Sequence, residues 1–295
     1  MNLNRTWQSL VIAWAWGSAL ALLGAVTAIV GFLLYQGAGT LNRALIFGHT
    51  AALDALLLRR PVFDGLFPAI VGTLLLVVLA VLMALPVGLA TGIYLAEYAR
   101  GKIKAIFSLI FDVLAGIPSI VIGLFGFSLA VFLHQHLSGR IYPCLTISAL
   151  ALAFLVLPYL IRSTQTALES LPTQIRIIAP ALGATKLQNI YHVLLPRALQ
   201  AIMSGVILAI GRCAEDTAVI MLTGAVATAG IPGGLLNSYE ALPFYIYYIS
   251  SQYADPEELL RGYGAAILLL TICLFLFTLS KLIEKMLAMR LHQRL

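Results

Sequence analysis

Long apolar stretches without charged residues recur along this chain of 295 residues. A helix needs about 20 apolar residues to cross the hydrocarbon core of a bilayer, and these stretches are of that order. The pattern predicts six membrane-spanning helices, at residues 11–34, 67–95, 107–133, 143–161, 198–226 and 262–280. We therefore expect an all-α, polytopic membrane protein that forms one transmembrane domain over residues 1–295, with its core at about 67–282.

Composition supports lipid as the surrounding solvent. Hydrophobic residues make up 61% of the chain and charged residues 10%, whereas soluble proteins carry roughly 25% charged residues. The net charge is +6, but the basic residues lie between apolar runs and form no stripe with interleaved aromatic residues. We therefore expect a lipid membrane as a partner and no nucleic acid.

The distribution of Lys and Arg predicts the orientation. Six spans place both termini on one side, and most basic residues then lie on that side, in the tails, the 96–105 loop and the 162–197 segment. Because loops rich in Lys and Arg stay in the cytoplasm, we predict that both termini are cytoplasmic. The first apolar run is longer than the roughly 7–15 residues of a signal-peptide core, so we interpret it as a retained anchor.

A long polar connection follows the fourth span. The segment 166–196 has the pattern of a helical hairpin, with Pro172 near its start, Gly183 at the turn and a second helix that ends at Pro196. Connections of this length are unusual and often functional. The pattern alone leaves open whether this is a functional hairpin or a plain helical link.

The fifth span carries charges inside an apolar run. A charged residue at the centre of a spanning helix costs roughly 2.5–3.5 kcal/mol. Arg212 precedes Glu215 and Asp216 by three and four residues, a spacing that puts all three on one helix face. They form either a local ion pair or part of a polar pathway, for which the planar guanidinium of Arg offers donors suited to phosphate oxygens.

Other features of the spans concern helix geometry. Gly116-Ile117-Pro118-Ser119 interrupts the third span, and it predicts either a packing kink or a pathway kink. Gly88 and Gly92 permit close contact between helices, which we expect within the subunit. Asp112 is expected to pair with a basic residue such as Lys104.

No catalytic motif is present. The chain has no HExxH, GxSxG or Walker A sequence, and its histidines and cysteines lack the spacing of metal ligands. We therefore expect no enzyme activity, no metal and no cofactor in this chain.

The run from Ile177 to Pro196, IIAPALGATKLQNIYHVLLP, resembles the coupling motif of ABC importer permeases. That motif is Glu-Ala-Ala, three residues, Gly, nine residues, Ile, one residue, Leu-Pro. The matching positions are Ala179, Gly183, Val193, Leu195 and Pro196. Ile177 and Ile178 replace the Glu and the first Ala. The resemblance implies that these residues contact an ATPase subunit.

The likeness extends from about residue 71 to residue 282 and includes LPVGLATGIYLAEYA (85–99), LAGIPSIVIGLFGF (114–127), LPYLIRSTQTAL (157–168) and GVILAIGRCAEDTAVIMLTGA (205–225). It is strongest to the A-type permease subunits of bacterial phosphate-specific importers. Those permeases carry an Arg and then Gly-Glu-Thr, which Arg212, Asp216 and Thr217 match, while Glu215 replaces the Gly. The pathway residues implied are Arg212, Glu215, Asp216, Thr217, Pro118 and Ser119.

The resemblance also implies a function and partners. The chain would import inorganic phosphate across the bacterial inner membrane. It would act with a second related permease subunit, two ATPase subunits that bind the ATP, and an extracytoplasmic phosphate-binding protein. Two alternatives stay open: a permease for another oxyanion or a phosphonate, and a membrane signalling subunit that senses transport.

Overall fold

The computed structural model describes residues 3–57, 62, 64–137, 139 and 142–292. The helices are α1 (Leu3–Gly37), α2 (Arg43–Phe47), α3 (Ala52–Leu56), α4 (Phe67–Ile93), α5 (Gly101–Ala115), α6 (Ser119–His136), α7 (Leu145–Glu169), α8 (Thr173–Ala181), α9 (Lys186–Asn189), α10 (Leu195–Glu215), α11 (Ala218–Thr223), α12 (Leu242–Gln252) and α13 (Pro256–His292). A 3-10 turn, Ala38–Thr40, follows α1, and π-helical turns, Tyr94–Tyr98 and Ile190–Leu194, extend α4 and join α9 to α10.

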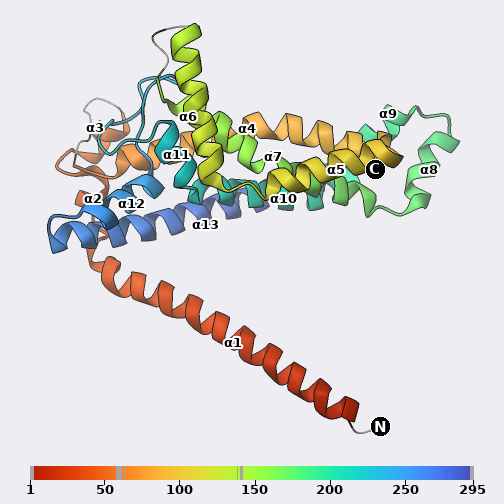
Figure 1. The fold of residues 1–295 in the computed structure, drawn as a ribbon, viewed down its shortest axis with the longest axis horizontal. Coiled ribbons are helices and arrows are strands. Elements are labelled where there is room, and N and C mark those ends of the chain that lie inside the picture. The colour runs from red at the N-terminus through yellow and green to blue at the C-terminus, as the bar shows by residue number, and fades with distance from the viewer. Residues whose placement is uncertain (1–2, 58–61, 63, 138, 140–141, 293–295) are drawn as a thin grey trace.

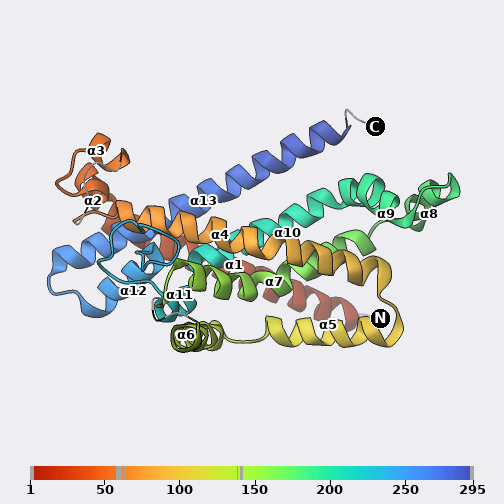
Figure 2. The same cartoon turned by 90° about the horizontal axis from the view of Figure 1, so that it is seen from above.

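Six helical stretches are long and apolar enough to cross a membrane. They are Trp7–Thr40, Phe67–Tyr98, Ser119–His136, Leu145–Glu169, Lys186–Glu215 and Pro256–Leu287. The all-α fold class with six spanning helices is therefore confirmed. The hairpin α8–α9 and the free ends of α1 and α13 lie at one end of the bundle, which we call the hairpin end (Figures 1 and 2).

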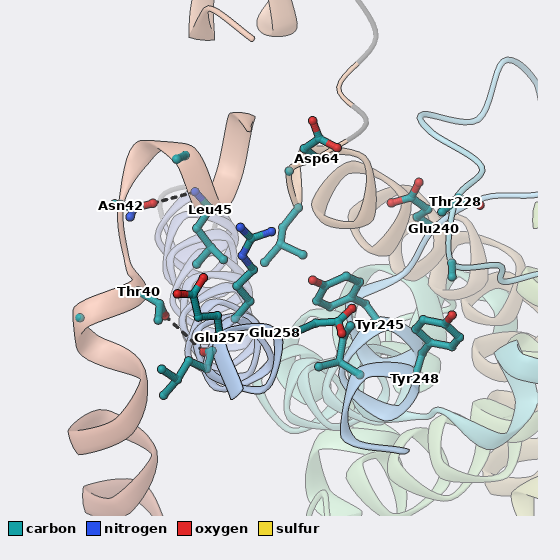
Figure 3. Close-up of a pocket in the computed structure, with 18 residues that line it drawn as sticks. Thr40, Asn42, Leu45, Asp64, Thr228, Glu240, Tyr245, Tyr248, Glu257 and Glu258 are labelled. Carbon is teal, nitrogen blue, oxygen red and sulfur yellow. Dashed lines mark hydrogen bonds between the residues drawn. The ribbon is translucent and has the colours of Figure 1, made fainter. Parts of the chain in front are cut away.

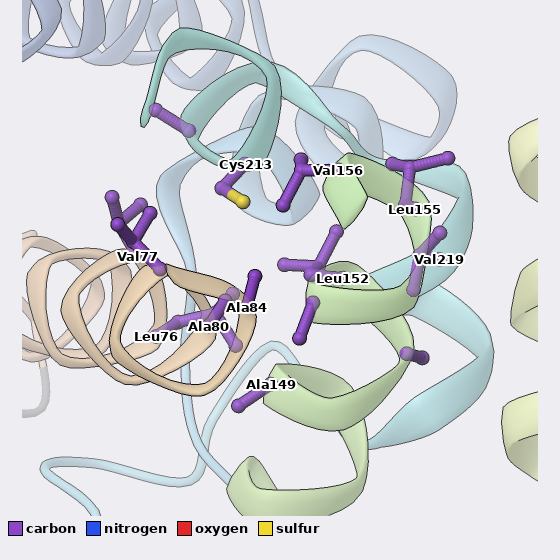
Figure 4. Close-up of a cluster of buried hydrophobic side chains, with 14 of the residues drawn as sticks. Leu76, Val77, Ala80, Ala84, Ala149, Leu152, Leu155, Val156, Cys213 and Val219 are labelled. Atoms are coloured by element: carbon purple, nitrogen blue, oxygen red, sulfur yellow. The ribbon is translucent and has the colours of Figure 1, made fainter. Parts of the chain in front are cut away.

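The core forms where α4, α7, α10 and α11 meet. Figure 4 shows apolar side chains of α4 and α7 facing one another, with Cys213 of α10 beside them. Glycines bring α4 and α7 close together, since a Cβ on Gly88 would lie 2.7 Å from Leu160 Cβ and one on Gly92 would lie 2.5 Å from Thr164 Cβ. The predicted contact of the two glycines within the subunit is confirmed.

Helix α1 leaves this bundle (Figure 1). The C-terminal end of α1 meets α13. There the ring of Phe32 lies edge-on to the ring of Tyr263, with 5.8 Å between the ring centres, and Gly37 packs against Tyr263 and Ile267. Most of its large apolar side chains are exposed. Such a surface suits lipid or another membrane subunit, because in water a patch of this extent would promote association.

The predicted third span, 107–133, is wrong as a single helix. The chain forms α5 up to Ala115, breaks over residues 116–118 and begins α6 at Ser119. Pro118 has no N–H and disfavours the helical conformation in the residue before it, so α5 cannot continue through it. Helix α6 runs steeply to the long helices in Figure 1 and is seen nearly end-on in Figure 2.

The predicted fifth span, 198–226, is also wrong in its bounds. Its helix begins earlier, at Lys186, and ends at Glu215. Asp216 takes an extended backbone conformation, and the chain resumes as the short α11. The run of apolar residues therefore does not correspond to one continuous helix.

Asp112 pairs with a basic residue, as expected, but its partner is Arg162 and not the suggested Lys104. Asp112 Oδ1 accepts a hydrogen bond from Arg162 Nε at 3.0 Å, and Lys104 Nζ pairs with Glu169 at 2.7 Å. Asp112 and Lys104 are eight residues apart on α5, so about 12 Å of helix separates them. Both ion pairs join α5 to α7 instead.

Candidate translocation site and coupling hairpin

The charged cluster of α10 is an ion-paired group at the end of that helix. Arg212 Nη1 donates to Glu215 Oε1 at 3.2 Å, and Arg212 Nη2 lies 3.6 Å from Asp216 Oδ2. The spacing of three and four residues thus brings the three side chains together, as predicted. Asp216 does so from just beyond the last helical residue.

The two acids have different surroundings. The Asp216 side chain is 2% exposed, and its Oδ1 accepts the backbone N–H of Val219 at 2.9 Å. This bond satisfies a donor in the first turn of α11, so Asp216 holds the break between the two helices in place. Thr217 lies in the same connection, immediately before α11. Asp216 is therefore a structural partner for Arg212 and is not open to a ligand.

Glu215 and Arg212 face outward. The Glu215 side chain is 62% exposed and the Arg212 side chain 37% exposed on the isolated subunit. Arg212 Nε is buried and has no hydrogen-bond partner, so part of the guanidinium fork remains unused. Charged groups on a spanning helix avoid lipid and face protein or a water-filled path. This face therefore requires a polar cavity or a second subunit next to it.

Pro118 and Ser119 lie at the start of α6. Pro118 is exposed and Ser119 half-buried. One turn later α6 packs closely against α11, since a Cβ on Gly123 would lie 3.0 Å from the Ala218 carbonyl oxygen. Among the described residues, no hydrogen bond joins Pro118 or Ser119 to Arg212. The structure thus brings α6 beside the connection that follows Arg212 without direct contact to the guanidinium.

The predicted hairpin consists of α8, a turn and α9. Gly183 has φ +87°, a conformation that favours glycine, and Leu182 precedes it at the tip. Thr185 begins α9 with a capping box, in which its hydroxyl accepts from Gln188 N and the Gln188 side chain accepts from Thr185 N.

The second helix of the hairpin does not end at Pro196, contrary to the prediction. A π-helical turn, Ile190–Leu194, leads into α10, and Pro196 occupies its first turn. A proline is tolerated there because that N–H has no required helical partner. Helix α9, the second arm of the hairpin, is therefore continuous with the span that carries the charged cluster.

The outer surface of the hairpin is apolar. Its exposed large side chains are Ile177, Ile178, Leu182, Leu187 and Tyr191. Four of the other motif positions are half-buried: Ala179, Val193, Leu195 and Pro196. Gly183 is exposed at the turn. Ile177, which replaces the acid of the motif, belongs to this apolar surface. The structure thus groups two of the predicted coupling residues, Ile177 and Gly183, at the outer part of the hairpin.

The base of the hairpin contains charged contacts that the sequence did not predict. Arg176 of α8 pairs with Glu97 and also donates to the carbonyls of Leu168 and Leu171 at the end of α7. Lys186 of α9 donates to the carbonyl oxygen of Glu97. The two contacts to Glu97 join residues 79 and 89 positions apart, so no local spacing reveals them.

A separate cavity of about 550 Å³ lies at the end opposite the hairpin (Figure 3). Its charged and aromatic lining residues are Asp64, Glu240, Tyr245, Tyr248, Glu257, Glu258 and Arg261. Burial raises the pKa of Glu240, and backbone N–H groups of Gly230 and Ala229 oppose this rise. Among the described lining residues the acids outnumber Arg261, so this lining does not suit an anion.

Six apolar helices, a charged group inside one of them and a hairpin continuous with that helix define a multi-pass membrane transport subunit. The model of the family described as binding-protein-dependent transport system inner membrane component matches residues 88–289. The chain belongs to this family. It is thus a multi-pass inner-membrane permease subunit of an ABC importer and not an enzyme, since the ATPase of such importers is a separate subunit.

Curated relatives and solved structures agree with this assignment. The chain is 34% identical over 216 residues to the phosphate transport system permease protein PstA of Haemophilus influenzae, covering 72% of this chain and 74% of that one. PstA of Yersinia pestis is 34% identical over 217 residues, covering 73% and 70%. The probable ABC transporter permease protein YqgI of Bacillus subtilis is 25% identical over 288 residues, covering 92% and 94%.

Two solved transporters share the fold. A bacterial ABC transporter that imports the acidic polysaccharide alginate has a TM-score of 0.58 at 16% identity, covering 95% of this chain and 98% of that one. The methionine ABC transporter MetNI has a TM-score of 0.56 at 18% identity, covering 81% and 99%. At these identities the likeness concerns the fold alone.

Proposed function

We propose that this permease carries inorganic phosphate into the cytoplasm and that Arg212 contacts the anion on its way. The observation that carries the proposal is the Arg212 side chain, which is 37% exposed on a spanning helix of the isolated subunit. A planar guanidinium recognises phosphate oxygens through paired N–H donors. The names of the PstA relatives support phosphate as the cargo.

The neighbours of Arg212 have separate roles in this proposal. Asp216 fixes the guanidinium, and Thr217 lies in the connection that Asp216 stabilises. Glu215 offsets part of the positive charge, so that phosphate binds weakly enough to leave. Transport requires such weak, reversible binding. Pro118 and Ser119 shape the neighbouring wall by ending α5 and beginning α6 beside α11.

A complete transporter requires further subunits. A second related permease would cover the exposed face of Arg212 and Glu215 and complete the pathway. An extracytoplasmic phosphate-binding protein would deliver the anion at the end opposite the hairpin. Two ATPase subunits would bind the ATP, and this chain would bind no cofactor and act as one permease domain. Both termini and the hairpin are cytoplasmic in this arrangement, in agreement with the excess of basic residues on that side.

The hairpin surface defined above would contact the ATPase. Leu182 is 84% exposed at its tip, and Ile177 and Ile178 lie close by on α8. The nearby cations Arg176 and Lys186 are turned inward to Glu97. At the position where the coupling motif has an acid, this chain presents the apolar side chain of Ile177. We therefore infer that the groove of the ATPase that receives the hairpin is also apolar.

Uptake by a reconstituted complex tests the cargo. The complex of both permeases and the ATPase is placed in liposomes, and labelled phosphate is supplied with the binding protein. ATP-dependent accumulation that unlabelled phosphate suppresses, and that sulfate and a phosphonate do not, is the expected result. Suppression by sulfate or the phosphonate in preference to phosphate would favour the other oxyanion or phosphonate cargo. ATP hydrolysis without accumulation of any anion would favour the signalling alternative.

A further inference from the structure

Both arms of the hairpin contact Glu97, which lies in the π-helical turn at the end of α4. The Glu97 carboxylate pairs with Arg176 of α8, and the two side chains are 9% and 22% exposed. The Glu97 carbonyl oxygen accepts from Lys186 of α9, whose ammonium also lies 4.4 Å from the centre of the Tyr98 ring. One residue of α4 thus contacts the hairpin on both sides of its turn.

Arg176 extends this contact to α7 and back to α9. Its guanidinium donates to the carbonyl oxygens of Leu168 and Leu171, where α7 ends, and its own carbonyl accepts from Asn189 Nδ2 at 2.9 Å. An apolar cluster lies beside these bonds, with Leu168 and Ala167 of α7 packed among residues of 190–202 and half-buried side chains of α4. The hairpin base, the end of α4 and the end of α7 therefore form one connected unit.

We propose that Glu97 is a positioning residue that couples movement of the hairpin to α4 and α7. The hairpin is covalently continuous with α10, so the ATPase could move α10 without any help from Glu97. Helices α4 and α7, however, form the other side of the core around Cys213 and are joined to the hairpin by α8 and by the contacts at Glu97. This proposal rests on the proposed import function and on the hairpin as the ATPase contact.

Glu97 can couple the hairpin to α4 because its carboxylate is buried in the ion pair with Arg176. Removing one partner of a buried ion pair leaves the other charge without compensation, so the pair is much more restrictive than an exposed one. Without the Glu97 carboxylate, Arg176 loses its ion-pair partner, and the side-chain link between α8 and the end of α4 is broken. The outer apolar surface of the hairpin, which would bind the ATPase, is untouched by this change.

The test compares uptake with ATP hydrolysis in the reconstituted complex. The variant is Glu97→Gln, and Glu97→Asp tests rescue by a shorter carboxylate. Asp112→Asn is the control, because it removes another acid of the subunit whose ion pair, with Arg162 of α7, lies outside the hairpin. We expect Glu97→Gln to lower phosphate uptake per ATP hydrolysed by about tenfold, the size of a typical coupling between sites. Glu97→Asp should recover part of this loss, and Asp112→Asn should leave the ratio unchanged.

A second measurement makes the result independent of the cargo. Spin labels at Leu82 of α4 and Gln174 of α8 report the distance between the helix and the hairpin, and both positions are exposed. We expect one narrow distance distribution in the otherwise unmodified complex and a broad one with Glu97→Gln.

The outcomes separate this inference from the proposed cargo. If the unmodified complex moves no phosphate yet Glu97→Gln broadens the distance distribution, the cargo is wrong and the role of Glu97 stands. An unchanged distribution, or an unchanged ratio of uptake to hydrolysis, would overturn the inference. If Glu97→Gln does not assemble, Arg176→Lys, which keeps the charge and loses the fork, is measured in the same two ways.

Discussion

The unequal burial of Glu215 and Asp216 leads to a prediction about stability. Asp216→Ala removes the buried acceptor of Val219 N and the anion 3.6 Å from Arg212. Leaving the buried N–H of Val219 without its acceptor costs about 1–3 kcal/mol, and Arg212 also loses a charge partner. Glu215→Ala removes an acid whose side chain is 62% exposed, and exposed ion pairs contribute about 0–1 kcal/mol. We expect the first substitution to lower the free energy of unfolding by several times more than the second.

The cysteines offer a direct assay. Cys144 and Cys213 are buried, so a thiol-reactive fluorescent dye reports their exposure as the detergent-solubilised protein is heated. Asp216→Ala should shift this transition to a much lower temperature, and Glu215→Ala should shift it little. Asp216→Asn keeps an acceptor for Val219 N and should fall between them. Equal shifts for Asp216→Ala and Glu215→Ala would refute the assignment of Asp216 as the structural partner and Glu215 as the outward-facing one.

Three further predictions concern other parts of the molecule. Gly92→Leu should lower the free energy of unfolding by at least about 1–3 kcal/mol, because its Cβ would lie 2.5 Å from a Thr side chain of α7; Gly24→Leu on α1, with open space around it, is the control in the same thermal assay. Binding of the ATPase should persist in about 1 M salt, which screens exposed ion pairs, and should be lost in Leu182→Asp, as measured by co-elution. Because burial raises the pKa of Glu240 above 4.5, the native state favours the protonated acid, so its contribution to stability falls as the pH rises from 4.5 through the native pKa. Glu240→Gln, which keeps an acceptor for the N–H of Gly230, should remove this fall in a series of melting curves at increasing pH.

The sequence predicted the spanning helices well where apolar length alone decides. It failed where a local break interrupts an apolar run. The predicted 107–133 span merged α5 with α6, and the predicted 198–226 span ran across the end of α10 at Glu215. Hydropathy averages over such breaks, because a proline or one extended residue changes the backbone and leaves the mean hydropathy almost unchanged. The Gly-Ile-Pro sequence was the available signal for the first break.

Contacts between distant segments were beyond the sequence. The acids near Arg212 were found because they lie within one helical turn of it, where spacing determines proximity. Glu97, Arg176 and Lys186 were missed because their contacts depend on how the hairpin folds back on α4. The same limitation explains the wrong partner for Asp112. Charged residues at the ends of apolar spans indicate that partners exist, but they do not identify them.

The central claim is that Arg212 lines the path of the anion, and one uptake measurement tests it most directly. Labelled phosphate is supplied to liposomes that contain the full complex with Arg212→Ala or with the unmodified chain, and assembly with the ATPase is checked in both. Arg197→Ala, an exposed Arg on the same helix, is the control. The account predicts that Arg212→Ala abolishes phosphate uptake while assembly is retained and Arg197→Ala transports normally. Unchanged uptake with Arg212→Ala would contradict the claim and would leave Arg212 as no more than the ion-pair partner of Glu215 and Asp216.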